Sequence, residues 1–405
     1  MRRALLLLLP CSAALIAAPN DTAAVLPFAN STTNANVDWI GVSISENLRD
    51  GLSSRGLVTL GRDDIQEAYR RLHLRDRALL TEASAIKAGE ALDAEQVVFG
   101  TFEFLPAPPA GTPGASAGSL KISAKIVDRR QLRQSPEFAE TGALEDLPAL
   151  EAHLAWRALV LLAPKLAPEE SDFRSLRPSI RLDAEENYIR GLMARQPEQR
   201  EKYFAQAARL DARFVHPCFE LGLIHYQRKE YRQAAEWLQH AGPTDVEYHQ
   251  ASFFLGLALF QAGDYVGAQK ALQTVAAVVP LSEVFNDLAA AESRRNLPQA
   301  LDDFRKALDG DPNDPVYHFN VGYALFKKGD FAAAADRFRA ALDRNPDDQI
   351  ATLLLGRCLK KQGLRSGDSG DARLQNLERL KTNFEERAYR QLKSVINPIP
   401  DPPQP

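Results

Sequence analysis

The stretch GYALFKKGDFAAAADRFRAALDRNP, residues Gly322–Pro346, decides the fold of the C-terminal half of the chain. Small residues recur where two helices would cross, larger apolar residues stand between them, and a proline follows the second helix. Gly322 has a counterpart at Gly356, and Gly222 has one at Gly256, each pair 34 residues apart. Similarity at a fixed period of this length is typical of stacked helix–turn–helix units.

This pattern resembles the tetratricopeptide repeat family, whose unit places small residues, aromatic residues and a closing proline at fixed positions over about 34 residues. Weaker units flank the clear ones. NYIRGLMA (Asn187–Ala194) and YFAQAARLDARF (Tyr203–Phe214) together indicate a first repeat, and LLLGRCLKKQG (Leu353–Gly363) supplies a first helix alone. The sequence therefore predicts an all-α superhelix of about five repeats over residues 183–365, the last of them partial.

Residues 21–166 follow a different pattern, in which short strands alternate with helices. SLKISAKIV (Ser119–Val127) alternates strictly between apolar and polar residues, as a half-buried strand does. AAVLPF (Ala23–Phe28) and QVVFGTFEF (Gln96–Phe104) indicate two further strands, so we expect an α/β domain. A helix after the third strand carries one apolar face, made of Leu147, Leu150, Leu154, Ala158 and Leu161.

The α/β region also resembles a known family. VLPFAN, DWIGVSISENLRDGLSSRG, VTLGRD, AGEALDAEQVVFGTFEF and LKISAKIVD follow the order seen in the TolB amino-terminal domain and in related flagellar and curli-assembly outer-membrane proteins. The resemblance implies an envelope-associated, non-catalytic module that mediates assembly contacts. The repeats stand where TolB has its β-propeller, so a Tol–Pal role is not carried over. LPAPPAGTPGASAG (Leu105–Gly118) reads as a flexible loop without the alternation of a membrane strand, which argues against a curli-type pore.

The N-terminus is typical of an export signal. Arg2 and Arg3 precede apolar residues in a segment too short to span a bilayer comfortably. We expect a signal peptide over residues 1–18 and a periplasmic or outer-membrane-associated protein without a transmembrane segment in its mature chain. Lipid modification of Cys11 stays open, although Pro10 stands where a lipoprotein signal demands a small residue.

Composition limits the partners. The chain has 405 residues and a formal net charge of −4, without the basic excess that nucleic acid or an anionic membrane surface attracts. We therefore expect protein partners and no nucleic acid. Three remaining segments are a linker at residues 167–182, a loop with a C-terminal capping helix at 366–396 (helical from about 372 to 395), and a disordered proline-rich tail at 397–405.

No motif for catalysis, cofactor binding or metal binding is found. The histidines within residues 216–249, His216 among them, lack the spacing of a helical metal site. Cys218 and Cys358 lie several repeats apart, beyond the reach of a disulfide. The acidic cluster around Glu185 stands at a predicted helix start, where the helix dipole accounts for it. We predict a protein that is not an enzyme and has no cofactor.

The candidate functional surface is the inner face of the superhelix. The middle position of each first helix is apolar here, whereas the resembled family often has a polar residue there, so we expect an apolar groove suited to a hydrophobic helix or extended segment. Helix packing alone is the alternative reading of its aromatic residues. Toward its C-terminal end the inner face becomes basic, with Arg357, Lys360 and Lys361. These residues either bind an acidic partner or form a solvated cap. The other groove residues are Phe219, Leu223, Tyr226, Phe253, Leu257, Phe260, Phe319, Tyr323 and Phe326.

Three functions fit this sequence. The first is a non-catalytic exported scaffold that binds envelope proteins through the superhelix. The second is an outer-membrane assembly, secretion or transport accessory whose α/β domain is the working part. The third is an enzyme or regulator without a known motif. The first function predicts that Leu257→Glu with Tyr323→Glu abolishes partner binding without unfolding the repeats.

Overall fold

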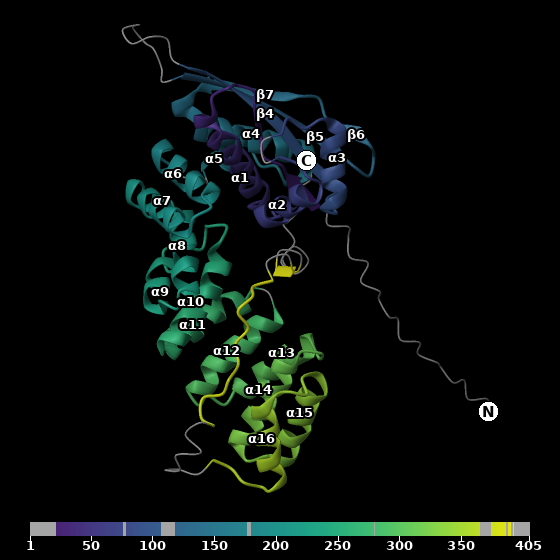
Figure 1. Ribbon diagram of the computed structural model, residues 1–405, viewed down its shortest axis with the longest axis vertical. Coiled ribbons are helices and arrows are strands. Elements are labelled where there is room, and N and C mark those ends of the chain that lie inside the picture. Colours follow the sequence, from purple (N-terminus) through teal and green to yellow (C-terminus); the bar gives the residue numbers. More distant parts are fainter. Residues whose placement is uncertain are drawn as a thin grey trace, which may run out of the picture.

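An α/β region lies at one end of the molecule, and a helical array extends away from it (Figure 1). This arrangement confirms the predicted fold class. The predicted signal peptide (residues 1–18, with Cys11) and the proline-rich tail (397–405) lie outside the described residues, as does most of the insert Leu105–Gly118. The computed structural model describes residues 22–75, 78–106, 118–175, 180–278, 280–364, 374–385, 388–389 and 392.

A seven-stranded mixed sheet forms the centre of the α/β region, in the order β3-β1-β4-β5-β6, with β2 paired to β4 and β7 to β5. β1 runs parallel to β3 and β4, and β2 runs parallel to β4, whereas the long β4–β5 pair is antiparallel, from Gln96↔Asp128 to Pro106↔Gly118. The alternation of apolar and polar residues predicted for β5 is confirmed by its burial pattern, in which Leu120, Ile122, Ala124 and Ile126 are buried. The strands are β1 (Thr22–Val25), β2 (Ala29–Asn30), β3 (Val58–Thr59), β4 (Gln96–Pro106), β5 (Gly118–Asp128), β6 (Arg133–Gln134) and β7 (Phe138–Ala143).

Helices cover both faces of this sheet, because its central strands are apolar on both sides. On β4, Val98 packs into the core shared with α1 and α4, and Val97 packs into the core shared with α2 and α3. Short 3-10 turns η1 (Ala35–Val37), η2 (Leu144–Asp146) and η3 (Pro164–Leu166) stand between the larger elements. The helices are α1 (Trp39–Ser53), α2 (Arg62–Arg71), α3 (Glu82–Ala91) and α4 (Leu147–Leu162).

Helix α4 buries the predicted apolar face except at its C-terminal end. Leu154 and Ala158 are fully buried as expected, but Leu161 is 48% exposed and Leu159 is buried in its place. Leucine stands on most sides of this helix, so apolar spacing alone does not fix which side faces inward. Contacts with α1 and β7 decide the rotation.

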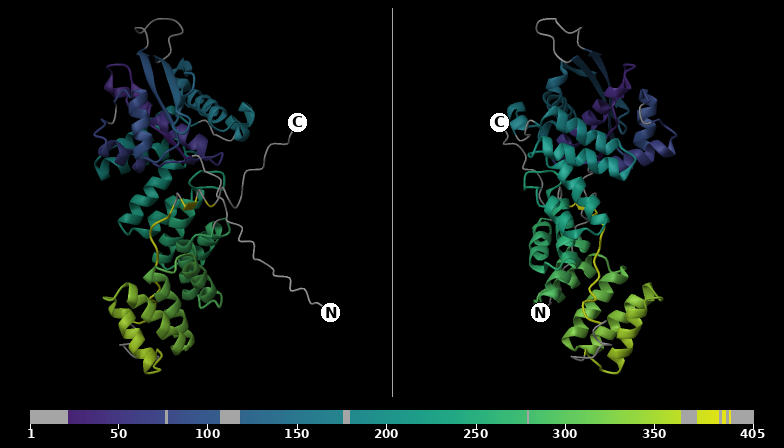
Figure 2. Two further views of the ribbon diagram at one scale, coloured as in Figure 1. Left: turned by 90° about the vertical axis from the view of Figure 1, so that its right-hand side faces the viewer. Right: turned by 60° about the vertical axis from the view of Figure 1, so that its left-hand side comes forward.

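The helical array consists of five packed helix pairs followed by α16, within the residues described. Each helix packs mainly on its neighbours along the chain, as expected of a solenoid. The two views in Figure 2 show the array continuing away from the α/β region. Its helices are α6 (Leu182–Met193), α7 (Pro197–Leu210), α8 (His216–Gln227), α9 (Tyr231–Leu238), α10 (Tyr248–Ala262), α11 (Tyr265–Ala276), α12 (Ser282–Arg294), α13 (Ala300–Gly310), α14 (Pro315–Lys328), α15 (Phe331–Arg344) and α16 (Gln349–Leu359).

The described part of the interval predicted as a linker, residues 167–175 and 180–182, packs against its neighbours. It contains α5 (Glu170–Ser175), whose Phe173 is 1% exposed. Phe173 belongs to one hydrophobic core that runs from the sheet through α1 and α4 into α6 and α7, where Tyr188 and Phe204 lie. The α/β region and the array are therefore joined through a common core, and the apolar Phe173 explains why the interval does not behave as a spacer.

The predicted C-terminal capping helix is wrong over residues 374–385. These residues, named the docked segment below, are not helical and run along the array from α14 and α16 toward α10 (Figures 1 and 2). Their backbone groups bond to side chains of the array instead of to one another, which removes the helical hydrogen bonds. A helical turn follows, in which Tyr389 donates to the Glu385 carbonyl. The predicted loop at 366–371 lies outside the described residues.

Candidate protein-binding groove

The predicted inner-face residues lie beneath the docked segment or in the helix cores next to it. Phe253 contacts Phe384 with ring centroids 5.3 Å apart, and the Tyr323 hydroxyl donates to the Leu374 carbonyl at 2.8 Å. Leu223 and Tyr226 are half-buried. The remaining apolar members of the predicted set are at most 8% exposed: Phe219, Phe253, Leu257, Phe260, Phe319, Tyr323 and Phe326.

Two buried asparagines hold the main chain of the docked segment. Asn320 accepts from the Arg379 amide at 2.9 Å and donates to the Arg379 carbonyl at 2.7 Å. Asn286 donates to the same carbonyl at 2.8 Å, and Asn320 donates to Asn286 at 2.7 Å. Both side chains are fully buried, so these bonds form away from bulk water, where an unpaired amide would be costly.

Acidic side chains of α12 accept hydrogen bonds from further backbone amides of the docked segment. Asp287 accepts from the Lys381 amide at 2.8 Å, and Glu283 accepts from the Glu385 amide at 3.1 Å. Burial raises the pKa of Asp287 well above its ordinary value and also raises the pKa of Glu283. The groove thus binds the main chain of the docked segment at intervals, at Arg379, Lys381 and Glu385, through atoms that every amino acid shares.

Cationic side chains of the docked segment meet one wall of the groove. The Arg379 guanidinium lies 3.4 Å from the Phe319 ring centroid and donates to Asp348 at 2.9 Å. Lys381 pairs with Asp314 in the same way. Asp314 and Asp348 are the N-caps of α14 and α16, each accepting a backbone amide of its own helix. The Arg379 hydrogen bond lowers the pKa of Asp348.

The opposite wall holds the segment's carboxylate. Glu378, whose side chain is 0% exposed, accepts from Ser293 at 2.6 Å and pairs with Arg294 and with Lys327. Burial alone would raise the pKa of Glu378, but the Ser293 hydrogen bond and the charges of Lys327 and Arg294 outweigh it and lower the pKa. These partners stand at the C-terminal ends of α12 and α14, so the groove is basic on this wall and acidic on the other.

The groove is therefore more polar than predicted. Sequence reasoning missed Asn286 and Asn320, although their 34-residue separation matches the repeat and offered a signal. The predicted basic end lies elsewhere: Lys360 and Lys361 are exposed beyond α16, and Arg357 donates to the Gly363 carbonyl at 3.5 Å.

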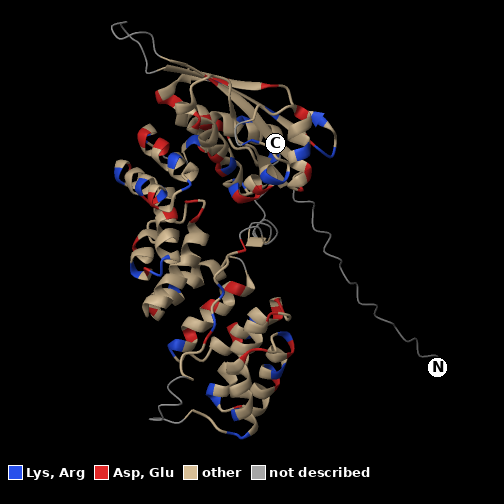
Figure 3. Ribbon diagram, viewed as in Figure 1, with Lys and Arg blue, Asp and Glu red and all other residues tan. Residues whose placement is uncertain are grey.

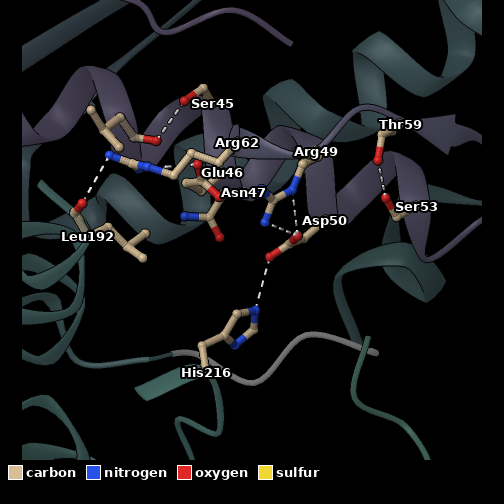
Figure 4. Close-up of polar contacts among 12 residues, drawn as sticks. Ser45, Glu46, Asn47, Arg49, Asp50, Ser53, Thr59, Arg62, Leu192 and His216 are labelled. Carbon is tan, nitrogen blue, oxygen red and sulfur yellow. Dashed lines mark hydrogen bonds and ion pairs between the residues drawn. The ribbon is translucent and has the colours of Figure 1, made fainter. Parts of the chain in front are cut away.

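A second polar cluster joins the α/β region to the array. His216, at the start of α8, lies 2.9 Å from Asp50 of α1 (Figure 4). It also lies 3.2 Å from Glu247, the N-cap of α10. Arg49 pairs with Asp50 at 3.1 Å. Burial lowers the pKa of His216, but the charge of Glu247 and the hydrogen bond that His216 donates to Asp50 outweigh it and raise the pKa to about 9.

The donor atoms of Asp50, His216 and Glu247 lie within 4.8 Å of one another, as the atoms around a metal ion do. The Arg49 guanidinium already supplies positive charge to Asp50, and the raised pKa keeps the imidazole protonated at neutral pH, so the arrangement works as a buried ion-pair network. A cavity of about 1160 Å³ adjoins it. Sequence reasoning excluded His216 from a helical metal site and identified no partner for it, because Asp50 stands 166 residues away in the chain.

Glu185 also belongs to this junction, and not only to a helix terminus as predicted. Its side chain is 4% exposed and accepts from Ser43 at 2.8 Å and from Asn47 at 2.6 Å, both on α1. Elsewhere, Lys and Arg mix with Asp and Glu over the α/β region and the array (Figure 3). This mixture agrees with the small net charge.

A tetratricopeptide repeat model matches residues 219–283, 255–315 and 319–383. The part of the array from α8 onward matches tetratricopeptide repeats. These matches cover the helices that form the groove, while α6 and α7 precede them. A comparison with curated protein sequences finds no match.

Several solved structures resemble the tetratricopeptide array in fold. YrrB, described as a TPR protein with an unusual peptide-binding site, is 16% identical, with 51% of this chain and 98% of that chain covered and a TM-score of 0.40. MamA 41-end from Desulfovibrio magneticus RS-1 is 22% identical, with 41% and 95% covered and a TM-score of 0.37. A MamA RS-1 ArsTM double mutant is 23% identical, with 40% and 92% covered and a TM-score of 0.36.

Within the described part of the chain, no helix combines the length and the apolar composition needed to span a bilayer. The two cysteines described, Cys218 and Cys358, are both buried free thiols.

Proposed function

We propose that the protein is a non-catalytic scaffold that binds protein partners through the inner groove of its tetratricopeptide array. The observation that supports this proposal is the main-chain recognition by Asn286 and Asn320. A site that binds backbone groups of an extended segment, with side-chain contacts on both sides, has the chemistry of peptide recognition. Stacked repeats supply the extended surface for it.

The test uses full-length variants of the groove. Asn320→Ala removes two hydrogen bonds to a bound main chain, and Asn313→Ala changes an exposed asparagine in the preceding turn. Crosslinking in the native cell followed by mass spectrometry should recover partners with Asn313→Ala and lose them with Asn320→Ala, at matched far-UV circular dichroism. Partners retained by Asn320→Ala would place binding elsewhere.

The pair of substitutions suggested by the sequence, Leu257→Glu with Tyr323→Glu, is unsuitable for this purpose. Leu257 is 0% exposed and Tyr323 is 1% exposed with the docked segment in place. A carboxylate forced into such a site is costly without a partner, so these changes would unfold the repeats rather than report on binding.

We further propose that the scaffold is exported and works in the cell envelope, with a TolB-like α/β domain as its docking module. The composition of residues 1–18 and the order of motifs in the α/β region support this proposal. Fractionation of cells that express the full chain, with and without residues 1–18, tests it: the full chain should enter the periplasmic or outer-membrane fraction. Retention of both in the cytoplasm would refute export.

The alternative is an outer-membrane accessory in which the α/β region does the work. The core shared by α1, α4 and α6 favours the two parts acting together, since separation would expose it. Under the alternative, the full-length Asn320→Ala variant would still co-purify with outer membranes and support their assembly. Under the scaffold proposal, the variant reaches the same fraction but loses its partners.

A further inference from the structure

We propose that the groove selects an extended peptide of the pattern acidic–basic–leucine–basic–x–x–aromatic, and that residues 378–384 occupy it until a partner segment of this chemistry displaces them. The inference rests on the proposed function and adds the chemistry of the partner. The occupying residues are Glu378, Arg379, Leu380, Lys381, Thr382, Asn383 and Phe384.

The docked segment is bound as a peptide ligand is bound, through hydrogen bonds from its backbone to side chains of the array. Three of its backbone amides, those of Arg379, Lys381 and Glu385, donate to side chains of α12 and α14. Three of its carbonyls, those of Leu374, Asn376 and Arg379, accept from side chains of the same helices. A helix packed as a cap would satisfy these groups internally, whereas a bound extended peptide leaves them to the receptor.

Charge order gives the site its selectivity. Successive residues of an extended chain point to opposite sides, and residues two apart share a side. Arg379 and Lys381 accordingly reach the acidic wall, at Asp348 and Asp314, while Glu378 points to the basic wall. A peptide shifted by one residue would place each charge against its own sign, which disfavours other registers.

Apolar contacts fix the middle and the aromatic end of the pattern. Leu380, between the charged Arg379 and Lys381, packs against the apolar clusters of both α10 and α14. Phe384 lies against Phe253 and 5.4 Å from the Tyr389 ring. Main-chain bonds supply affinity for any extended peptide, and the leucine and aromatic contacts restrict which sequences fit.

Exchange with a partner is favoured by the nature of the charged contacts. The Arg379 and Lys381 side chains stay 28% and 31% exposed, and ion pairs in contact with water contribute little to stability. The segment is covalently tethered, which gives it an effective concentration on the order of millimolar. A free peptide must compete with that concentration, so emptying the groove should raise its apparent affinity.

The experiment measures binding of a fluorescent peptide with the sequence of residues 374–389 to the full chain. Arg379→Glu in the protein places a carboxylate against Asp348 and should empty the groove, with Lys381→Glu as a second such variant. We expect each variant to bind the peptide at least about tenfold more tightly than the unmodified chain. Adding Asn320→Ala to Arg379→Glu should weaken binding about tenfold, and a scrambled peptide should not bind.

Hydrogen exchange reports the occupant directly. In the unmodified chain the amides of Arg379, Lys381 and Glu385 should exchange slowly, and in Arg379→Glu the latter two should exchange rapidly. Rapid exchange in the unmodified chain, or equal peptide binding by all variants, would overturn the inference. If the inference fails in this way but Asn320→Ala still loses its partners, the proposed scaffold function stands. If the peptide binds as expected but no partner depends on the groove, the scaffold function is refuted and the inference stands.

A second copy of the chain is the competing occupant. Mixing the Arg379→Glu chain, which has an intact groove, with the Asn320→Ala chain, which has an intact segment, separates the cases by light scattering after gel filtration. Monomers throughout support binding within one chain. A heterodimer formed only in the mixture, together with a dimeric unmodified chain, would overturn the intramolecular arrangement.

Discussion

Gly256 and Gly356 occupy equivalent repeat positions but have different surroundings. A β-carbon on Gly256 would lie 2.5 Å from Cγ of Leu272, on the second helix of the same pair. A β-carbon on Gly356 would meet no atom of the described residues within 4 Å. Sequence spacing predicts the same close helix crossing for both, and the structure shows that crossing only where the partner helix packs.

Alanine at these two positions should have opposite effects. Gly256→Ala forces Leu272 or the helix to move and should lower the free energy of unfolding by about 1–3 kcal/mol. Gly356→Ala adds a better helix former in open space and should raise it by about 0.5–1 kcal/mol. Urea unfolding followed by circular dichroism measures both. Equal losses would mean that α16 packs as closely as α10 does.

At the scale of the element, α4 shows where periodicity reaches its limit. Leu154→Ala removes a fully buried side chain and should cost about 2–5 kcal/mol of unfolding free energy. Leu161→Ala removes one that is 48% exposed and should change it by less than about 0.5 kcal/mol. The same urea titration compares the two variants. A large loss for Leu161→Ala would restore the stripe that the sequence predicts.

The docked segment illustrates a second limit at this scale. Its Leu, Glu, Arg and Lys residues are good helix formers, and local propensity therefore predicts a helix. Propensities of a few tenths of a kcal/mol per residue are outweighed when Asn286, Asn320 and Asp287 bind the backbone. The inner-face aromatic residues were predictable because the repeat fixes their positions. The occupant was not, since no local pattern relates residues 374–385 to helices 60–100 residues earlier.

At the scale of the whole molecule, the junction between the α/β region and the array depends on residues that no sequence pattern connects. Glu185 meets Ser43 from 142 residues away, and His216 meets Asp50 from 166 residues away. The two fold classes were predictable separately, because each has its own periodicity. Their common core was not, because its apolar residues fit either region equally well.

His216 gives this junction a pH dependence with a definite sign. Its folded pKa, about 9, lies above the ordinary value of 6.5, so protonation stabilises the fold. The contribution is complete below about pH 6.5, fades as the pH rises, and is lost above about pH 9. Its full size is on the order of 3 kcal/mol, and it arises from Glu247 and Asp50 against the opposing charge of Arg49.

Urea titrations of the unmodified chain and of His216→Gln between pH 6 and pH 10 test this dependence. The difference in unfolding free energy should be largest near pH 6 and should vanish near pH 10, because glutamine stays neutral throughout. His240→Gln, which changes an exposed histidine of the same array, should keep the profile of the unmodified chain. A constant difference across the range would show that His216 contributes packing to the junction and no charge.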